Sequence, residues 1–207
     1  IYFEYAQSLY NKGNISESIN NFKISANYHK KTRDIYQNPS YQMDFASIYF
    51  WLAFLGENKK ENWLNYIKEA KEAIKLNYYE GLNNRPSKSW NSVYSKPYIL
   101  ATMSFIARSY GELALLEENN SKKEEYLSIG EDYFIKSIPL ELNHHFFEYY
   151  RFYFNHACFY SIKAEIKASN QQDYSNDLEI CFKSLKESYK ADAANVFKLL
   201  KKELEAK

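Results

Sequence analysis

The chain has 207 residues, enough for one domain with a sizeable core. Only two valines and two threonines occur, with five glycines and four prolines, which disfavours β-rich folds and parallel α/β folds alike. The 27 basic and 26 acidic residues nearly cancel, so no bulk charge attracts nucleic acid or an acidic membrane. Composition therefore predicts an all-α fold with neither nucleic acid nor membrane as a partner.

Hydrophobic periodicity predicts helices along most of the chain, and several of them begin at a recognisable cap. Asn14, Asn58 and Ser121 each stand three residues before a glutamate, the spacing of a capping box at a helix start. Each cap closely follows an apolar segment, so the sequence predicts helical hairpins with tight turns. The expected helices cover about 2–12, 16–36, 41–56, 59–77, 97–118, 121–138, 143–168, 173–190 and 192–206.

The segment 78–96 interrupts this pattern and is predicted to form a long loop. It contains Gly81, Pro86 and four aromatic residues spread among polar ones. Loops of this length are uncommon in compact domains and often carry a function. A binding role for this loop and simple packing of its aromatic side chains over a helix junction both remain open.

The final predicted helix has apolar residues at helical spacing and lysines between them. We expect the apolar stripe to cover the last hairpin and the lysines to face water, as in the terminal unit of a stacked repeat. The stripe consists of Ala193, Val196, Phe197, Leu200 and Leu204.

Small and aromatic residues also alternate around predicted turns in a way that resembles the tetratricopeptide repeat. The residues that carry this resemblance are Ala6, Leu9, Tyr10, Gly13, Asn14, Ser18, Phe22 and Ser25, then Asn155, Ala157 and Tyr160, with weaker copies around Gly56, Ala70 and Ala73 and around Ala107, Tyr110 and Ser137. The resemblance implies one domain over residues 1–207, in which about four antiparallel hairpins stack as a right-handed superhelix and the last helix caps it. Because the chain begins at Ile1, we expect it to be a piece of a longer protein.

For function, the resemblance implies a scaffold that binds a peptide or a partner protein in a concave groove lined by the first helix of each hairpin. It implies no enzymatic activity, no cofactor and no metal. The family's inward positions fall on Gln7, Tyr10, Asn11, Phe50, Phe54, Arg108, Glu112, Arg151, Asn155 and Ser161.

Two of these positions are arginines in a chain that has 23 lysines and only four arginines. A guanidinium grips a carboxylate with two hydrogen bonds, so Arg108 and Arg151 predict an acidic peptide or a C-terminal carboxylate as ligand. Pairing inside the protein, for instance between Arg108 and Glu112 one turn away, is the alternative. Asn155 resembles a family asparagine that binds peptide backbone, and it could equally tie neighbouring helices together.

Two further functions remain open. Arg151 and His156 match the Arg-x4–6-His signature of the HEPN ribonucleases, although His156 occupies a repeat position that is usually apolar, which favours packing. The chain could also serve as a sensor or dimerisation module of a larger protein. Cys158 and Cys181 are too few for a disulfide framework or a cysteine-rich zinc site, so we expect packing thiols in a reducing cytoplasm. No apolar run is expected to span a membrane.

Overall fold

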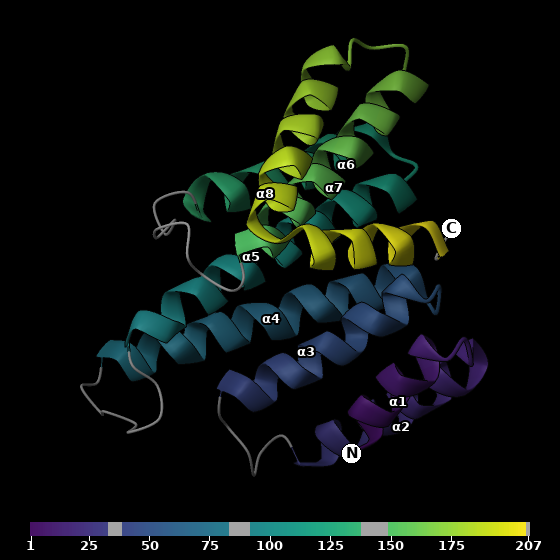
Figure 1. The fold of residues 1–207 in the computed structure, drawn as a ribbon, viewed down its shortest axis with the longest axis vertical. Coiled ribbons are helices and arrows are strands. Elements are labelled where there is room, and N and C mark those ends of the chain that lie inside the picture. Colours follow the sequence, from purple (N-terminus) through teal and green to yellow (C-terminus); the bar gives the residue numbers. More distant parts are fainter. Residues whose placement is uncertain (33–38, 83–91, 138–148, 206–207) are drawn as a thin grey trace. The chain divides into compact units, whose positions relative to one another are not determined.

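A computed structural model describes residues 1–32, 39–82, 92–137 and 149–205 (Figure 1). All regular structure in these ranges is helical, which confirms the predicted all-α fold. The helices are α1 (Tyr2–Asn11), α2 (Ile15–Thr32), α3 (Pro39–Phe54), α4 (Lys59–Leu82), α5 (Ser92–Leu116), α6 (Asn120–Ser137), α7 (Tyr149–Ser169) and α8 (Ser175–Glu205).

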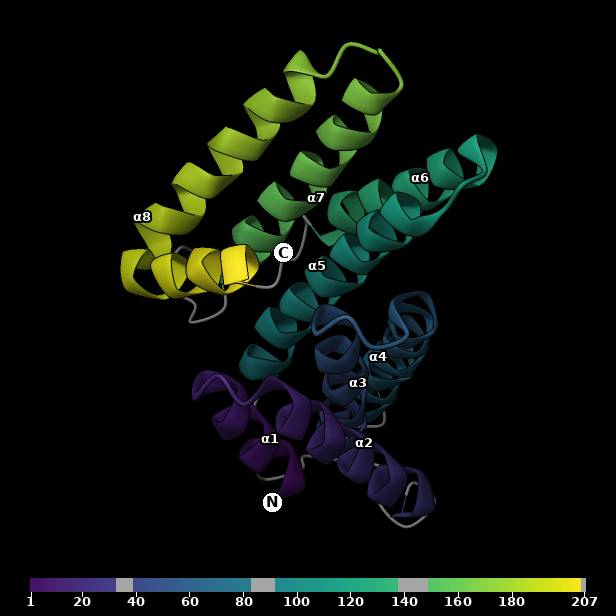
Figure 2. The same ribbon diagram turned by 90° about the vertical axis from the view of Figure 1, so that its right-hand side faces the viewer.

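The helices divide between two compact units, and the expected single repeat domain over residues 1–207 stays a prediction. The N-terminal unit, residues 1–85, contains the hairpins α1–α2 and α3–α4, with α2 packed on α3. The C-terminal unit, residues 86–207, contains the hairpins α5–α6 and α7–α8, with α7 packed on α5 and α6. Figure 2 shows α7 and the first half of α8 side by side along their length.

The first two hairpins close with the same glycine turn. After α1, Gly13 adopts a left-handed conformation with φ of 82°, and the backbone N–H of Asn14 donates to the carbonyl of Leu9 at 2.9 Å. After α3, Gly56 has φ of 88° and the N–H of Glu57 donates to the carbonyl of Leu52 at 2.9 Å. Glycine adopts this conformation without a steric penalty, so both turns follow directly from the sequence.

The other two hairpins close without glycine. The turn after α5 ends at Asn119, whose side-chain oxygen accepts the N–H of Lys122 at 3.1 Å and thereby caps α6. The cap is thus Asn119 rather than the predicted Ser121. After α7, Gln171 takes the left-handed position with φ of 57°, at a steric cost that glycine would avoid.

Aromatic residues fill the core of the N-terminal unit. The Ser18 hydroxyl donates to the carbonyl of Ala6 at 2.8 Å, so these two small residues bring α2 close to α1. One turn further along the same face of α2, the ring of Phe22 stacks on Trp51 of α3 with centroids 5.7 Å apart. Ala6, Ser18 and Phe22 in these contacts are residues that the repeat pattern singled out, whereas Trp51 is not.

In the C-terminal unit, a buried phenylalanine lies where α5, α6 and α7 meet. The ring of Phe159 packs against Gly111 on α5 and Gly130 on α6. A Cβ atom added at Gly130 would lie 2.4 Å from Cε2 of Phe159 and 3.0 Å from the carbonyl oxygen of Ala107. Both glycines therefore serve close packing rather than a turn.

The predicted loop at 78–96 is shorter than expected. Helix α4 continues to Leu82 and α5 begins at Ser92, so any loop lies within residues 83–91, outside the described ranges. Helix α4 thus runs past its predicted end at residue 77 and ends one residue after Gly81, close to a residue type that commonly marks a helix end. The binding role that the sequence left open for this loop concerns residues outside the described ranges, Trp90 among them, and stays open.

Helix α8 consists of two halves, as the separate predicted helices 173–190 and 192–206 require. Its backbone leaves the helical conformation at Asp192, with φ of −161° and ψ of 86°. Figures 1 and 2 both show the second half turning away from the direction of the first. The Asp192 carboxylate accepts the backbone N–H of Asn195 at 3.1 Å, which caps the second half and lowers the pKa of Asp192.

The second half of α8 presents a different face to the core than the sequence predicts. Val196 is fully buried, but the rest of the large apolar stripe is exposed: Phe197 by 69%, Leu200 by 37% and Leu204 by 77%. The face turned inward carries Val196 and Glu203, because Glu203 pairs with an arginine on α5. The inward face of this half therefore combines an apolar residue with a charged one, an arrangement that apolar periodicity alone does not predict.

Helix α5 contains one segment, Ile99–Leu116, that is long and apolar enough to cross a membrane, although no such run was expected. Of this segment, 72% is buried inside the protein, and its only charged residues are Arg108 and Glu112. Core helices that are covered on most sides share this composition with membrane spans.

Candidate functional site

The predicted groove residues of the N-terminal unit come together on α1 and α3. The ring of Tyr10 lies 5.1 Å from Trp51 and 6.4 Å from Phe54, and Phe50 stacks on Phe54 at 6.1 Å between centroids. Tyr10 is buried, whereas Phe50, Trp51 and Phe54 are half-buried. We call these four residues the α1–α3 aromatic surface.

Two amide side chains share a helical face next to Tyr10, about 60° and 100° around α1 from it. Gln7 precedes it by one turn and is half-buried, and Asn11 follows it directly and is exposed. Each amide offers two N–H donors and a carbonyl acceptor. The arrangement can therefore bind apolar side chains on its rings and hydrogen-bond a peptide backbone on its amides.

Arg108, by contrast, is only 3% exposed and has partners inside the C-terminal unit. Its guanidinium donates to both carboxylate oxygens of Glu203, at 2.7 and 2.9 Å, and lies 3.7 Å from the carboxylate of Glu112. Burial alone would lower the pKa of Arg108, but Cys158 and the two glutamates raise it above its usual range. Arg108 therefore pairs inside the protein with Glu112, the alternative that the sequence left open. Glu203 is an additional partner that the sequence did not indicate.

Asn155 is likewise an internal residue. It is 1% exposed, and its side-chain N–H donates to the hydroxyl of Ser104 at 3.0 Å. This hydrogen bond ties α7 to α5, so the structure places Asn155 in the helix-tying role and not on an open surface.

The remaining groove candidates of the C-terminal unit do not form one site with these residues. Arg151 is half-buried, and its Nε donates to the hydroxyl of Tyr150 at 2.9 Å. Glu112 is half-buried beside Arg108, and Ser161 is exposed on α7. Of the ten predicted residues, the five on α1 and α3 therefore give the more coherent surface.

His156 lies among aromatic rings on α7. Its ring centroid is 4.5 Å from Phe134 and 4.8 Å from Tyr160, and its Nδ1 lies 2.7 Å from the hydroxyl of Ser184. Burial lowers the pKa of His156 to about 4, although the charge of Glu131 opposes this shift. The imidazole is therefore neutral at pH 7, packed and hydrogen-bonded within the unit.

The packing of His156 bears on the HEPN signature. Arg151 and His156 are five residues apart on one helix, so their side chains leave α7 in directions about 140° apart. Arg151 bonds to its neighbour Tyr150, while His156 faces Ser184 of α8. This geometry matches the packing interpretation of His156.

A charged cluster between α6, α7 and α8 was not foreseen. Asp177 is almost fully buried, with its carboxylate 2.6 Å from Nζ of Lys167 and 3.6 Å from Nζ of Lys163. Lys163 also pairs with Glu131, which accepts the Tyr160 hydroxyl at 3.2 Å. Lys163 and Lys167 stand one turn apart, which places both lysines on one face of α7. Their acidic partners lie on α6 and α8, so the spacing within α7 could not identify them.

No cluster of three histidine, cysteine, aspartate or glutamate side chains that could hold a metal ion occurs in the described ranges. Cys158 and Cys181 are free thiols, and burial raises the pKa of both. Comparisons of the chain with family models, with curated proteins and with solved structures find no match.

Proposed function

We propose that the chain is a protein-binding scaffold of stacked helical hairpins, similar to tetratricopeptide proteins, which holds an extended segment of a partner on the α1–α3 aromatic surface. The observation that carries this proposal is the partial exposure of Phe50, Trp51 and Phe54 beside the amides of Gln7 and Asn11.

The surface has the properties of a binding hot spot. Aromatic side chains dominate the binding energy of protein interfaces when they are held in a fixed geometry. Here Tyr10 is buried beneath Trp51 and Phe54, and the glycine turn at Gly13 fixes the end of α1. The rings therefore hold a fixed arrangement before a ligand binds. The amide of Asn11, next to Tyr10 on α1, can donate hydrogen bonds to the ligand's backbone and accept them from it.

Several local features support the repeat-like stacking on which the proposal depends. Both hairpins of the N-terminal unit close with a left-handed glycine, Gly13 and Gly56. In the C-terminal unit, the first helix of one hairpin, α5, packs on the first helix of the next, α7. This order of neighbours is the one that stacked hairpins require.

The proposed ligand is recognised by its apolar side chains and its backbone. Arg108 does not favour an acidic ligand, because Glu203 already occupies its guanidinium. The α1–α3 aromatic surface itself contains no charged residue. We therefore expect a segment with two or more large apolar residues in an extended conformation.

Selection from a displayed library of unstructured peptides tests this proposal. Binders recovered on the full chain should lose roughly 2 kcal/mol of affinity in Phe50→Ala or Phe54→Ala, and less in Asn11→Ala. Phe182→Ala, which removes an exposed ring on α8, is the control and should have no effect. Binders that tolerate all the α1 and α3 substitutions would reject the surface.

The ribonuclease alternative has its own test. Incubation of the chain with single-stranded RNA should give no cleavage above that of His156→Gln protein. Cleavage that this substitution abolishes in a folded protein would replace the scaffold proposal.

A further inference from the structure

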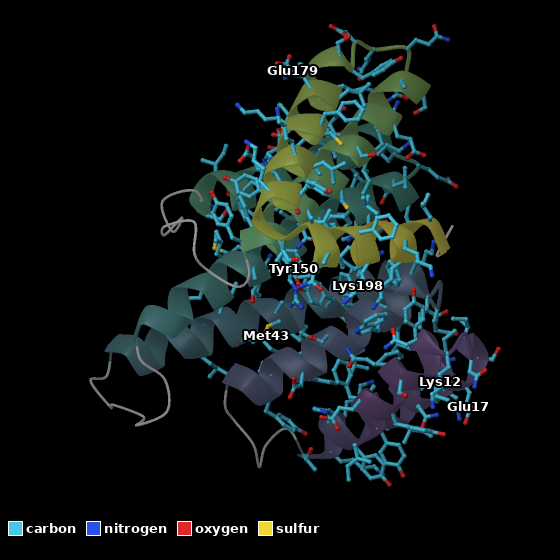
Figure 3. All side chains as sticks on the ribbon, viewed as in Figure 1. Lys12, Glu17, Met43, Tyr150, Glu179 and Lys198 are labelled. Atoms are coloured by element: carbon cyan, nitrogen blue, oxygen red, sulfur yellow. The ribbon has the colours of Figure 1, made fainter. Side chains whose placement is uncertain are left out.

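The second half of α8 covers a buried part of α5 and α7. Its Val196 is fully buried and packs with Phe154 and with Tyr150, which is labelled in Figure 3. On the same half, Glu203 accepts two hydrogen bonds from Arg108 of α5, at 2.7 and 2.9 Å, and Arg108 is only 3% exposed. This half of the helix therefore closes over a guanidinium on one helix and two aromatic rings on the next.

A break at a single residue separates this half from the rest of α8. Asp192 has φ of −161° and ψ of 86°, so rotation about its backbone can move residues 193–205 as one body. The moving part keeps its own cap, because the Asp192 carboxylate accepts N–H groups from both the backbone and the side chain of Asn195. We call residues 193–205 the α8 lid.

The α8 lid is attached less firmly than the first half of α8. On the first half, Asp177, Ser184 and Ser188 are all buried and bonded to α7. Within 193–204, by contrast, Val196 is the one buried residue, and most of the large apolar side chains are exposed. Apolar side chains that stay in water contribute little to holding a helix in place. The lid can therefore open while the first half stays packed.

Opening of the lid does not leave the arginine without a carboxylate. The guanidinium of Arg108 also lies 3.7 Å from the carboxylate of Glu112, one turn along α5. Glu112 stays on α5 when Glu203 leaves, and the uncovered guanidinium regains water. A buried charge is costly when it lacks both a partner and water. That cost falls on a closed state whose covering helix has no carboxylate, and not on the open state.

We propose that the α8 lid is an internal ligand, which a helix of a partner protein replaces on α5 and α7. The inward residues of the lid define what the partner carries. Val196, Leu199 and Glu203 lie within about 60° of one another around the helix. The first two pack against the rings of α7, and the third holds Arg108. The partner helix therefore has two aliphatic residues three positions apart and an aspartate or glutamate four positions after the second.

The charge pair makes this exchange selective. A helix that presents only apolar residues would close over Arg108 without supplying a carboxylate, and the desolvated guanidinium would oppose its binding. A helix with its acidic residue one position away would point the carboxylate about 100° aside. The surface under the lid therefore distinguishes helices by the position of one carboxylate.

A partner helix can displace the lid, whereas the lid of a second copy gains nothing. The lid of a second copy makes the same contacts as the resident one, and its association also costs translational and rotational entropy. The resident lid leaves room for a better occupant, because its half-buried positions include the polar residues Asn195 and Lys202. A helix with apolar residues at those positions would bury more apolar area.

Hydrogen exchange of the full chain tests the opening. Amides of residues 196–204 should exchange about tenfold or more faster than those of residues 178–188, on the first half of α8. Val196→Ala should increase this ratio further. Phe197→Ala, which removes a ring that is 69% exposed, is the matched control and should not change it. Equal rates in the two halves, or no response to Val196→Ala, would overturn the proposal.

A fluorescent peptide with the sequence of residues 190–205 tests the surface, with binding to the full chain followed by anisotropy. It should bind the Glu203→Gln chain about tenfold or more tightly than wild type, because the resident lid is weakened. The Val196→Ala chain should show the same direction if Glu203→Gln does not fold. A peptide that itself carries Glu203→Gln should bind about tenfold or more weakly, and a Phe197→Ser peptide should bind unchanged.

The chemistry of the partner is tested by a displayed library of the same peptide, randomised at the positions of Val196, Leu199 and Glu203. Selection on the Val196→Ala chain should return aliphatic residues at the first two positions and aspartate or glutamate at the third. Selected peptides without that acid, or equal binding of the parent peptide to wild type and Glu203→Gln, would reject the proposal. A wild-type dimer in sedimentation that the peptide converts to monomer would assign the surface to a second copy. Because all these residues lie in the C-terminal unit, this proposal and that for the α1–α3 aromatic surface can fail independently.

Discussion

Both units pack aromatic rings between helices, but they differ in how their buried charged groups are paired. In the N-terminal unit the buried carboxylate of Glu69 on α4 accepts a hydrogen bond from the neutral amide of Gln42 on α3, and the ion pair of Lys23 with Glu57 lies at the surface. In the C-terminal unit, α8 is attached to α5 and α7 through charged groups that are themselves buried, Arg108 and Asp177.

This difference affects how each unit responds to change. Ring stacking is non-directional enough to tolerate small adjustments, because its stabilisation is mainly the burial of apolar area. A buried charge depends on one partner at one distance, and loss of that partner leaves the charge desolvated. The C-terminal unit should therefore be the more sensitive to single substitutions and to pH.

The largest expected effect comes from Glu203→Gln. It weakens the pair that holds the buried Arg108, and we expect the C-terminal unit to lose about 3 kcal/mol of unfolding free energy. Hydrogen exchange of backbone amides, measured peptide by peptide, should show faster exchange first in residues 193–205. Glu57→Gln is the control, since the exposed pair with Lys23 contributes about 1 kcal/mol or less. Equal losses in the two variants would remove the contrast between the units.

Acid should act next most strongly, through His156. Its pKa is about 4 when folded and 6.5 when unfolded, so the unfolded chain binds more protons between these values. Stability is thus complete above about pH 6.5 and decreases as the pH falls towards 4, by at most about 3 kcal/mol. Denaturant titrations of wild type and His156→Phe at pH 7 and pH 5 measure this dependence. The same slope in both proteins would show that His156 is not its source.

Gly130→Ala should destabilise the C-terminal unit by about 2 kcal/mol, the usual cost of overpacking. The added Cβ would meet the Phe159 ring at 2.4 Å and the Ala107 carbonyl at 3.0 Å. Phe159→Leu in the same chain should recover part of the loss, whereas Gly13→Ala, with nothing within 4 Å of its added Cβ, cannot be rescued in this way. Thermal unfolding measures all of these variants, and a neutral Gly130→Ala would contradict the close packing.

The smallest effect concerns the hairpin turns. Gln171→Gly places glycine at the left-handed turn position that Gly13 and Gly56 occupy in the first two hairpins, and we expect a gain of about 0.5 kcal/mol. A melting temperature higher by about 1–2 °C would register it. A decrease would mean that the added freedom of the unfolded chain outweighs the strain.

Much of the N-terminal unit could be predicted because its determinants are local. The all-α fold followed from composition, and the hairpins followed from Gly13, Gly56 and the apolar periodicity. The groove residues on α1 and α3 came together because their spacing within each helix and the pairing of neighbouring helices sufficed to place them.

The C-terminal unit departed from prediction where a residue far along the chain decides the outcome. Arg108 and Glu203 are 95 positions apart, so helical spacing could not pair them and instead indicated Glu112. In the structure that contains this pair, Val196 lies inward and Phe197 outward, against the apolar periodicity. Neither Arg108 nor Glu203, taken alone in the sequence, indicates this arrangement.

The thiol of Cys158 packs beside Val196 of α8, so its reactivity reports on the attachment of α8. Burial raises the pKa of its thiol to about 12, so the reactive thiolate is a minor species at pH 7. Alkylation in the closed state is correspondingly slow, and it accelerates when the thiol becomes more solvated. The rate at which iodoacetamide consumes Cys158 therefore reports how readily this part of the protein opens.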